Sequence, residues 1–274
     1  MAPKPNLKVS VIMSVFNAEK TLREAIDSIV HQTFSDWEFV ICDDCSTDKS
    51  RSILDEYELA YPGQFIIIQN ETNMRLAASL NRCLEKCSGE YIARMDADDL
   101  SKEDRLEKQV AFLDNHPDYQ LVGSAMQRFD NSGMHDVVCI PENPNISVLK
   151  RGVTFCHATI MMRKTAYDAL HGYTVSDVVF RSQDYEMWFR FYALGMKGYN
   201  IQEPLYYVRE DINAIKRRSF KNRRCIMRIQ YNGYKLIKAP KSWYIYPVIE
   251  FSKSFIPSGL IMKFRRIQAH KYKE

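Results

Sequence analysis

The stretch that decides the fold is Tyr91-Ile92-Ala93-Arg94-Met95-Asp96-Ala97-Asp98-Asp99, an apolar run that ends in three carboxylates. Carboxylates this close together repel one another, and a nearby cation relieves the repulsion. Hard divalent ions such as Mg²⁺ prefer oxygen ligands and often share their coordination shell between protein carboxylates and substrate phosphates. The stretch therefore indicates a strand whose end holds a metal–diphosphate site. A solvated acidic turn that caps the next helix is the alternative.

Strands and helices alternate on the N-terminal side of this stretch. Runs rich in β-branched residues predict strands at 8–15, 37–42, 65–69 and 91–95. Apolar residues at helical spacing predict helices at 18–31, 49–61 and 76–87, of which Asn17 and Ser46 are expected to cap the first two. This alternation is typical of βαβ units, which build a parallel sheet covered by helices on both faces. The fold class is therefore α/β.

The pattern changes beyond Asp99. A helix is predicted at 105–115, and strands at 120–129 and 135–140 flank Asn131-Ser132-Gly133, which is a hairpin signal. A further strand is expected at 159–163 and an amphipathic helix at 183–194. This mixed second half could carry an acceptor site beside a nucleotide-binding first half.

Charge is distributed unevenly along the 274 residues. Residues 209–274 hold 17 Lys and Arg against 4 Asp and Glu, a net charge of +13, so residues 1–208 carry −9 because the whole chain carries +4. An acidic body suits a cation, and a basic end suits an anionic surface. The seven cysteines and the absence of an apolar stretch before Leu7 favour a reducing, cytoplasmic location. Cys42-x-x-Cys45 lacks a second such pair and is interpreted as part of a strand and its turn.

A second acidic pair, Asp43-Asp44, ends the predicted strand 37–42 at the same sheet edge as Asp96-x-Asp98. Together with their neighbours, these pairs make the chain resemble the family 2 glycosyltransferases over about residues 7–210. The motifs that carry the resemblance are Ser10–Asn17, Gln32–Phe34, Asp43–Asp48, Gly89–Asp99, Leu121–Ser124, His157–Thr159 and Gln183–Trp188.

The resemblance implies an inverting enzyme with the GT-A fold, which has a Rossmann-like nucleotide-binding half and a mixed central sheet. Residues 1–210 would form the catalytic domain, with the donor half at 7–100 and the acceptor half at 101–210. The enzyme would move a sugar from a nucleotide-sugar donor to a hydroxyl of a glycan or lipid-linked acceptor in cell-surface polysaccharide assembly, with Mn²⁺ or Mg²⁺. Uridine is the default nucleotide, with thymidine and guanosine open. The Gln-x-x-Arg-Trp motif of processive members is absent, so one sugar per encounter is expected.

The resemblance also implies the donor-site residues. Ser14 and Phe16 would line the base pocket, and Asp44 would accept a hydrogen bond from the imide N–H of the base. Arg75 stands where many relatives have glycine and some have a basic residue near the nucleotide; an ordinary surface arginine is the alternative. Asp98 would bind the metal ion directly. Asp96 would bind the ribose or a metal-bound water. Asp99 is expected to lie beyond the residues that bind the metal ion directly.

Asp184 is the implied general base, although an aspartate before an amphipathic helix is also a common N-cap. The family usually has Glu-Asp at this position, where this chain has Gln183-Asp184. His157 matches an acceptor-side histidine or a buried structural one. Residues 206–209 resemble a segment that closes over the donor. Cys45 replaces a common glycine, which puts the local turn geometry in question.

Residues 211–274 form a basic and aromatic C-terminal extension, expected to be helical. None of its apolar stretches reaches the roughly 20 residues that span a bilayer. Aromatic residues mixed with Lys and Arg suit an anionic membrane surface, so a peripheral position on the inner face of the cell membrane is expected. A solvated helical face and nucleic-acid binding are the alternatives, but no nucleic-acid-reading motif is present. An oligomer is possible.

Two other functions remain open from the residues. A Mg²⁺-dependent phosphohydrolase or nucleotidyltransferase also uses clustered aspartates, but it would leave Asp44 without a purpose. A non-catalytic nucleotide-sugar-binding protein would show no effect of Asp184→Asn on turnover.

Overall fold

The structure is a computed structural model that describes residues 7–150, 152–179, 182–210 and 220–252. Its strands form one sheet in the order β3-β2-β1-β4-β8-β6-β9-β5, with β7 paired to β6. The strands are β1 (Val9–Val15), β2 (Trp37–Asp43), β3 (Phe65–Gln69), β4 (Tyr91–Arg94), β5 (Leu100–Ser101), β6 (Leu121–Asp130), β7 (Gly133–Val138), β8 (Met161–Arg163) and β9 (Gly198–Arg209). The α-helices are α1 (Leu22–Val30), α2 (Ser50–Ala60), α3 (Arg75–Leu84), α4 (Arg105–Asn115), α5 (Lys164–Leu170), α6 (Gln183–Ala193), α7 (Phe220–Leu236) and α8 (Ile245–Ser252).

The first four strands of the sheet run parallel, whereas β8 is antiparallel to its neighbours β4 and β6. The predicted α/β class with a mixed central sheet is therefore confirmed. The chain passes from β1 outward to β2 and β3 and then returns to place β4 on the other side of β1. Open α/β sheets bind ligands at the carboxyl edge of such a switch point. The acidic pairs after β2 and β4 therefore flank the end of β1.

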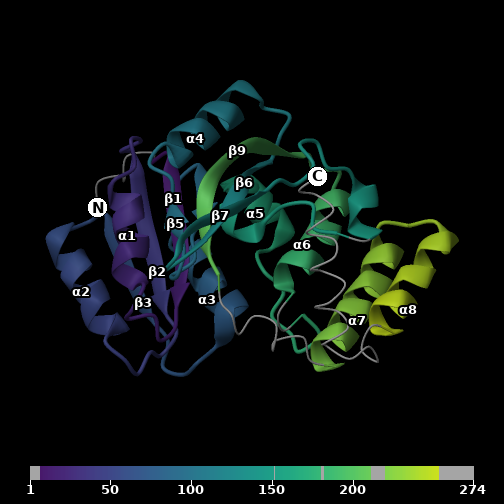
Figure 1. Ribbon diagram of the computed structural model, residues 1–274, viewed down its shortest axis with the longest axis horizontal. Coiled ribbons are helices and arrows are strands. Elements are labelled where there is room, and N and C mark those ends of the chain that lie inside the picture. The colour runs from purple at the N-terminus through teal and green to yellow at the C-terminus, as the bar shows by residue number, and fades with distance from the viewer. Residues whose placement is uncertain (1–6, 151, 180–181, 211–219, 253–274) are drawn as a thin grey trace.

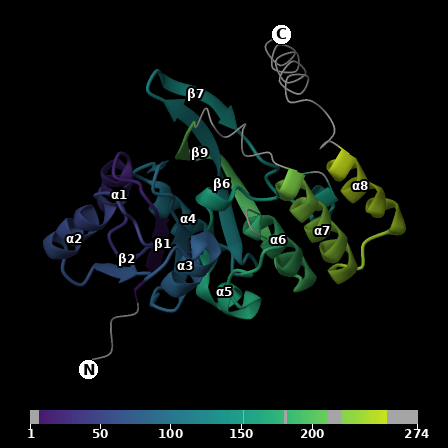
Figure 2. The ribbon, with the colours of Figure 1, turned by 90° about the horizontal axis from the view of Figure 1, so that it is seen from below.

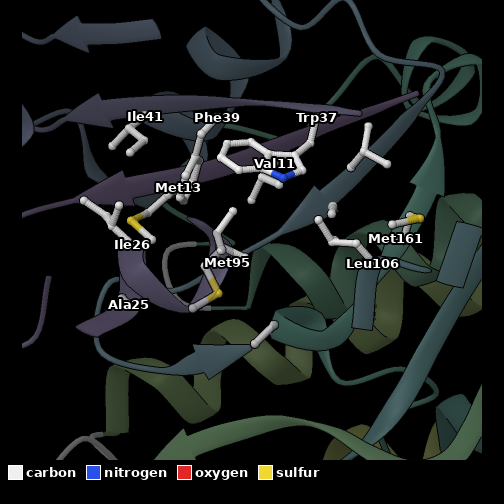
Figure 3. Packing of buried hydrophobic residues seen from close by; sticks show 14 of the residues in the cluster. Val11, Met13, Ala25, Ile26, Trp37, Phe39, Ile41, Met95, Leu106 and Met161 are labelled. Carbon is white, nitrogen blue, oxygen red and sulfur yellow. The ribbon is translucent and has the colours of Figure 1, made fainter. Parts of the chain in front are cut away.

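The two faces of the sheet bury separate apolar clusters. Val11 and Met13 of β1 point to the same side as Phe39 and Ile41 of β2, toward α1 (Figure 3). The other face packs against α3, α5, α6 and α7 through a second cluster of buried residues. Burial on both faces explains why the parallel strands are almost continuously apolar.

Helix α7 packs closely on α6. Ile229 and Tyr234 are buried in the cluster that contains Trp188 and Phe189. A Cβ atom added to Gly233 would lie 2.3 Å from Cγ of Phe189, so only glycine lets the two helices approach this closely. Figures 1 and 2 both place α7 and α8 side by side at the end of the molecule opposite α2. None of the described helices is both long and apolar enough to cross a membrane.

The predicted helix caps are wrong. Asn17 has a φ of 52° and its side-chain oxygen accepts a hydrogen bond from the Thr47 amide at 2.8 Å, so α1 begins only at Leu22. Ser46 Oγ accepts from the Asn17 amide at 3.0 Å, and Asp48 instead accepts from the Ser50 amide at the start of α2. The two polar side chains join the loops after β1 and β2 instead of capping helices. Strands β5 and β9 and helix α5 were not predicted from the sequence.

Candidate active site

A pocket of about 840 Å³ opens at the carboxyl edge of β1, β2 and β4. Its volume lies in the range typical of small-molecule sites, about 300–1,000 Å³. The pocket brings together residues from both acidic turns and from the start of α3. All six donor-site residues expected from the sequence line it: Ser14, Phe16, Asp44, Arg75, Asp96 and Asp98. Gln183, beside Asp184, and Asn222 of α7 complete part of the wall.

Asp44 lines the pocket and is held by three hydrogen bonds, and it is only 2% exposed. Its Oδ1 accepts hydrogen bonds from Asn70 Nδ2 and the Met74 amide, both at 2.7 Å, and its Oδ2 accepts one from the Arg75 amide at 2.8 Å. A carboxylate offers about four acceptor positions. The contacts of the described residues therefore leave one position, on Oδ2, for a ligand.

Asn70 is the side chain that binds Asp44, and it was not predicted from the sequence. It is buried, and its amide nitrogen donates both to Asp44 and to Ser79 Oγ at 2.9 Å. Its amide oxygen accepts from Arg82 and from the Cys42 thiol. A polar residue directly after a predicted buried strand, at the edge that carries the acidic pairs, was the available signal.

Asn70→Ala is expected to weaken binding of a nucleotide at Asp44 by about tenfold. A buried hydrogen bond to a charged group contributes about 1.5–3 kcal/mol, and rearrangement of the side chains around Asp44 should offset part of its loss. Isothermal titration calorimetry with UDP measures this. The matched control is Asn81→Ala on α3, which loses two hydrogen bonds to the Tyr173 backbone and should lower Tm without changing UDP affinity. Equal affinities in wild type and Asn70→Ala would contradict the assigned role.

Two residues near Asp44 occupy a backbone region that favours glycine. Cys45 has a φ of 64° and Arg75 a φ of 69°. The turn geometry expected of a glycine is therefore kept at Cys45 despite the side chain, at a cost of about 1 kcal/mol or more in strain. The Arg75 guanidinium lies 3.7 Å from Asp177, and both side chains are largely exposed, so this ion pair contributes little to stability.

Strand β9 forms hydrogen bonds with the acidic turn at residues 96–99. The Asp96 amide donates to the Tyr206 hydroxyl at 3.0 Å, and the Arg209 amide donates to Asp99 Oδ1 at 2.8 Å. Arg209 Nε also donates to the Asp98 carbonyl at 2.9 Å. Arg209 is not among the residues that line the pocket.

The three carboxylates of the turn have different surroundings. Asp98 is exposed in the pocket, and Asp96 is partly exposed with its Oδ1 2.6 Å from Arg94. Asp99 is 4% exposed, and burial, together with the charges of Asp96 and Asp98, raises its pKa to about 8. Asp96 and Asp98 are therefore the carboxylates of this turn that line the pocket.

Arg94 is a buried cation beneath the turn, and no pattern in the sequence singled it out. Its side chain is 1% exposed, and its Nε and Nη1 have no hydrogen-bond partner among the described residues. Burial opposes its charge, but the neighbouring Asp96 carboxylate outweighs that effect and raises the pKa of Arg94. Arg94 therefore offsets part of the negative charge of the turn.

Asp184 lies in the first turn of α6, next to Gln183 in the pocket wall. Burial raises the pKa of its carboxyl group above the usual value, while backbone amides at the start of the helix and the charge of Arg94 act in the opposite direction. A carboxylate that resists ionisation is more basic once it is ionised, as a general base requires.

His157 lies in a chain of hydrogen bonds. Its Nε2 is 2.8 Å from the Tyr173 hydroxyl, which lies 3.0 Å from the Tyr167 hydroxyl. Burial, and then the charge of Arg94, lowers the pKa of His157 well below its usual value. These contacts favour a neutral, structural histidine, which was one of the two interpretations from the sequence.

Among the described residues, two groups of side chains offer ligands for a divalent ion. Asp98 and Asp96 present carboxylate oxygens to the pocket, which is the ligand chemistry that Mg²⁺ and Mn²⁺ prefer. Asp130, His135 and Glu210 form a second group, with ligand atoms within 4.8 Å of one another, but none of the three lines the pocket. In this group His135 already lies 3.0 Å from Asp130, and Arg128 lies 3.6 Å from Glu210. The first group fits a donor-bound ion better.

Comparisons with known proteins show the family. Residues 10–170 match the family described as Glycosyl transferase family 2. EpsE of Bacillus subtilis (strain 168) is 44% identical over 97% of this chain and 96% of its own length. The amylovoran biosynthesis glycosyltransferase AmsE of Erwinia amylovora is 29% identical over 76% of this chain and 79% of its own.

Solved structures show the same fold. TarS of S. aureus in complex with UDP superposes with a TM-score of 0.67 at 19% identity, over 90% of this chain and 73% of that one. The mannosyltransferase PcManGT of Pyrobaculum calidifontis, in complex with GDP-Man and Mn²⁺, gives a TM-score of 0.60 at 17% identity, over 96% and 80%. The chain belongs to glycosyltransferase family 2 and has the GT-A fold.

Proposed function

We propose that the protein is a metal-dependent, inverting and non-processive glycosyltransferase that moves a hexosyl or N-acetylhexosaminyl group from a UDP-linked donor to a hydroxyl of a glycan or lipid-linked acceptor. The observation that carries the proposal is one pocket that is lined both by Asp44, which follows β2, and by Asp96 and Asp98, which follow β4. A nucleotide sugar has a base and a diphosphate to be held at once, and this pocket offers one group of residues for each.

The residues divide the work as follows. Asp44 holds the base, and Ser14 and Phe16 surround it. Asp98 and Asp96 would hold Mn²⁺ or Mg²⁺, whose charge stabilises the leaving nucleoside diphosphate. Asp184 takes the proton from the acceptor hydroxyl as its oxygen attacks the anomeric carbon opposite the leaving group, so the configuration inverts. Arg75 lies at the pocket rim, where its cation favours an anionic donor.

The hydrogen bonds of Asp44 favour uracil or thymine over guanine. Uracil presents one N–H between two carbonyl groups, which matches the one acceptor position left on Oδ2. Guanine presents two adjacent donor groups, N1–H and the 2-amino group, and would need both carboxylate oxygens. Oδ1 already accepts two hydrogen bonds from Asn70 and Met74. The complex of TarS with UDP supports the same choice.

UDP and dTDP are therefore expected to bind at least about tenfold more tightly than GDP, the difference of one unmade hydrogen bond in a buried site. Calorimetric titrations of the three diphosphates, with and without Mn²⁺, measure this. Tighter binding of GDP would contradict the choice of nucleotide. Release of phosphate from UDP without sugar transfer would instead support a phosphohydrolase.

The proposal also includes the acceptor and the location of the enzyme in the cell. AmsE is named for amylovoran biosynthesis, which supports a role in assembling a surface polysaccharide. We place the enzyme at the cytoplasmic face of the cell membrane, held by its basic C-terminal residues 211–274, where a lipid-linked acceptor would be available. Many of these residues, including the apolar run 255–262, lie outside the described residues.

A further inference from the structure

Helices α7 and α8 form a hairpin at one end of the molecule (Figures 1 and 2). A short 3₁₀ helix, Lys241–Tyr244, connects them. The hairpin is held by an ion pair of 2.9 Å between Arg223 and Glu250 and by the rings of Phe220 and Phe251, whose centroids lie 5.3 Å apart. One side of α7 packs on α6, so the outer surfaces of the hairpin face away from the sheet.

The outer face of α7 is cationic. Arg224, Arg228, Tyr231 and Lys235 are all exposed. Their spacing of four, three and four residues puts them on one stripe of the helix. Lys235 Nζ lies 4.5 Å from the centroid of the Tyr231 ring, and that ring packs edge-on against Tyr244, the last residue of the 3₁₀ helix before α8.

The outer face of α8 is apolar. Ile245, Val248 and Ile249 are 54%, 59% and 43% exposed, although each is a residue that folding normally buries. They are spaced three and one residues apart, so they form one ridge. We call the cationic stripe of α7 and this ridge together the hairpin surface. An apolar ridge next to cations is typical of a contact site rather than of a solvated helix.

The charge of the segment indicates what covers the hairpin surface. Residues 220–252 contain seven Lys and Arg but only one acidic residue, Glu250, which is paired with Arg223. We propose that the hairpin surface binds an anionic lipid bilayer, with the α7 cations on the lipid headgroups and the α8 ridge in the boundary below them. The proposal rests on the proposed function for its purpose, because a lipid-linked acceptor requires the enzyme at a membrane.

Vesicle co-sedimentation of the full chain tests the proposal. One set of vesicles contains phosphatidylcholine alone, and the other contains equal parts of phosphatidylcholine and phosphatidylglycerol. Binding is expected to the anionic set only and to fall as salt rises, because the headgroup contacts are screened. The triple variant Ile245→Ser, Val248→Ser, Ile249→Ser and the pair Arg224→Gln, Arg228→Gln should each weaken binding by at least about tenfold.

The matched control is Leu59→Ser, which removes an 84% exposed leucine from α2 at the opposite end of the molecule and should leave vesicle binding unchanged. Equal binding to both vesicle types, or wild-type binding by the ridge and cation variants, would overturn the proposal. A ridge variant that loses a protein partner but no vesicle binding would overturn it as well. UDP affinity, measured on the same preparations, reports on the proposed function separately, because the substituted side chains do not line the pocket.

Discussion

Asp184→Asn is expected to reduce sugar transfer by about 10²–10⁴-fold, the usual contribution of a positioned general base. Asparagine keeps the size of the side chain but cannot take the proton of the acceptor hydroxyl. UDP affinity should stay close to the wild-type value, because Asp184 itself is not among the residues that line the donor pocket. Transfer is measured as product formed from UDP-sugar and acceptor, and affinity by calorimetry.

Glu186→Gln provides the matched control on the same helix. Glu186 is bound by Arg190 at 2.9 Å, so its loss should change stability slightly and transfer hardly at all. Wild-type turnover in Asp184→Asn would remove Asp184 from the mechanism. Turnover lost equally in both variants would indicate damage to α6 rather than loss of a base.

The raised pKa of Asp184 also sets a pH dependence. A base works only when ionised, and burial raises the pKa of this carboxyl group, so activity should fall on acidification at a higher pH than for an ordinary aspartate. Because the pKa of Asp184 is higher in the folded than in the unfolded chain, ionisation of this group lowers the free energy of unfolding. This loss of stability begins as pH rises through the pKa that the group has in the unfolded chain. Asp184→Asn removes this cost, so the inactive variant should have an equal or higher Tm at neutral pH.

Asp98→Ala is expected to abolish the increase in UDP affinity that Mn²⁺ produces. Asp98 is the exposed carboxylate of the acidic turn and the proposed direct ligand of the ion. Removing such a ligand should cost more than the about 10–100-fold lost with an outer partner. Titrations of UDP with and without Mn²⁺ should then give nearly the same affinity. Asp118→Ala, at an exposed aspartate outside the pocket, controls for the loss of one negative charge.

The second group of possible ligands makes this experiment decisive. If the Mn²⁺ effect survives in Asp98→Ala but disappears in His135→Ala, the relevant ion lies at Asp130, His135 and Glu210 instead. Survival in both variants would leave neither group as the site.

The sequence predicted the parallel half of the sheet well because that half is built from local patterns. Each of its strands is a short apolar run, and the acidic pairs lie at the ends of two of them. The six residues expected at the donor site line one pocket, and most of them lie in motifs at the strand ends. Strand β9 was missed because its pairing with β6 joins segments far apart in the chain and its residues are only partly apolar.

The supporting residues were the hardest to predict. Arg94 looks like a charge interrupting a strand, and only its contact with Asp96 explains why it is buried. Asn70 looks like an ordinary loop residue until its hydrogen bonds to Asp44 are seen. The Asn70 contact joins the ends of two strands 26 residues apart, so its role depends on the folded sheet, although its place directly after a strand was a signal. Arg94 is close to Asp96 in the sequence, but its burial depends on the packing around it.

The contacts that join β9 to the acidic turn bear on how the protein matures during synthesis. Asp96 and Tyr206, like Asp99 and Arg209, are 110 residues apart in the chain. A growing chain that has emerged only as far as the acidic turn carries every aspartate of the two acidic pairs but lacks the partners that shape the second one. The turn can form these hydrogen bonds only after the chain has been synthesised as far as Arg209. The nascent protein therefore passes through a stage in which both acidic pairs are present but the acidic turn lacks its β9 contacts.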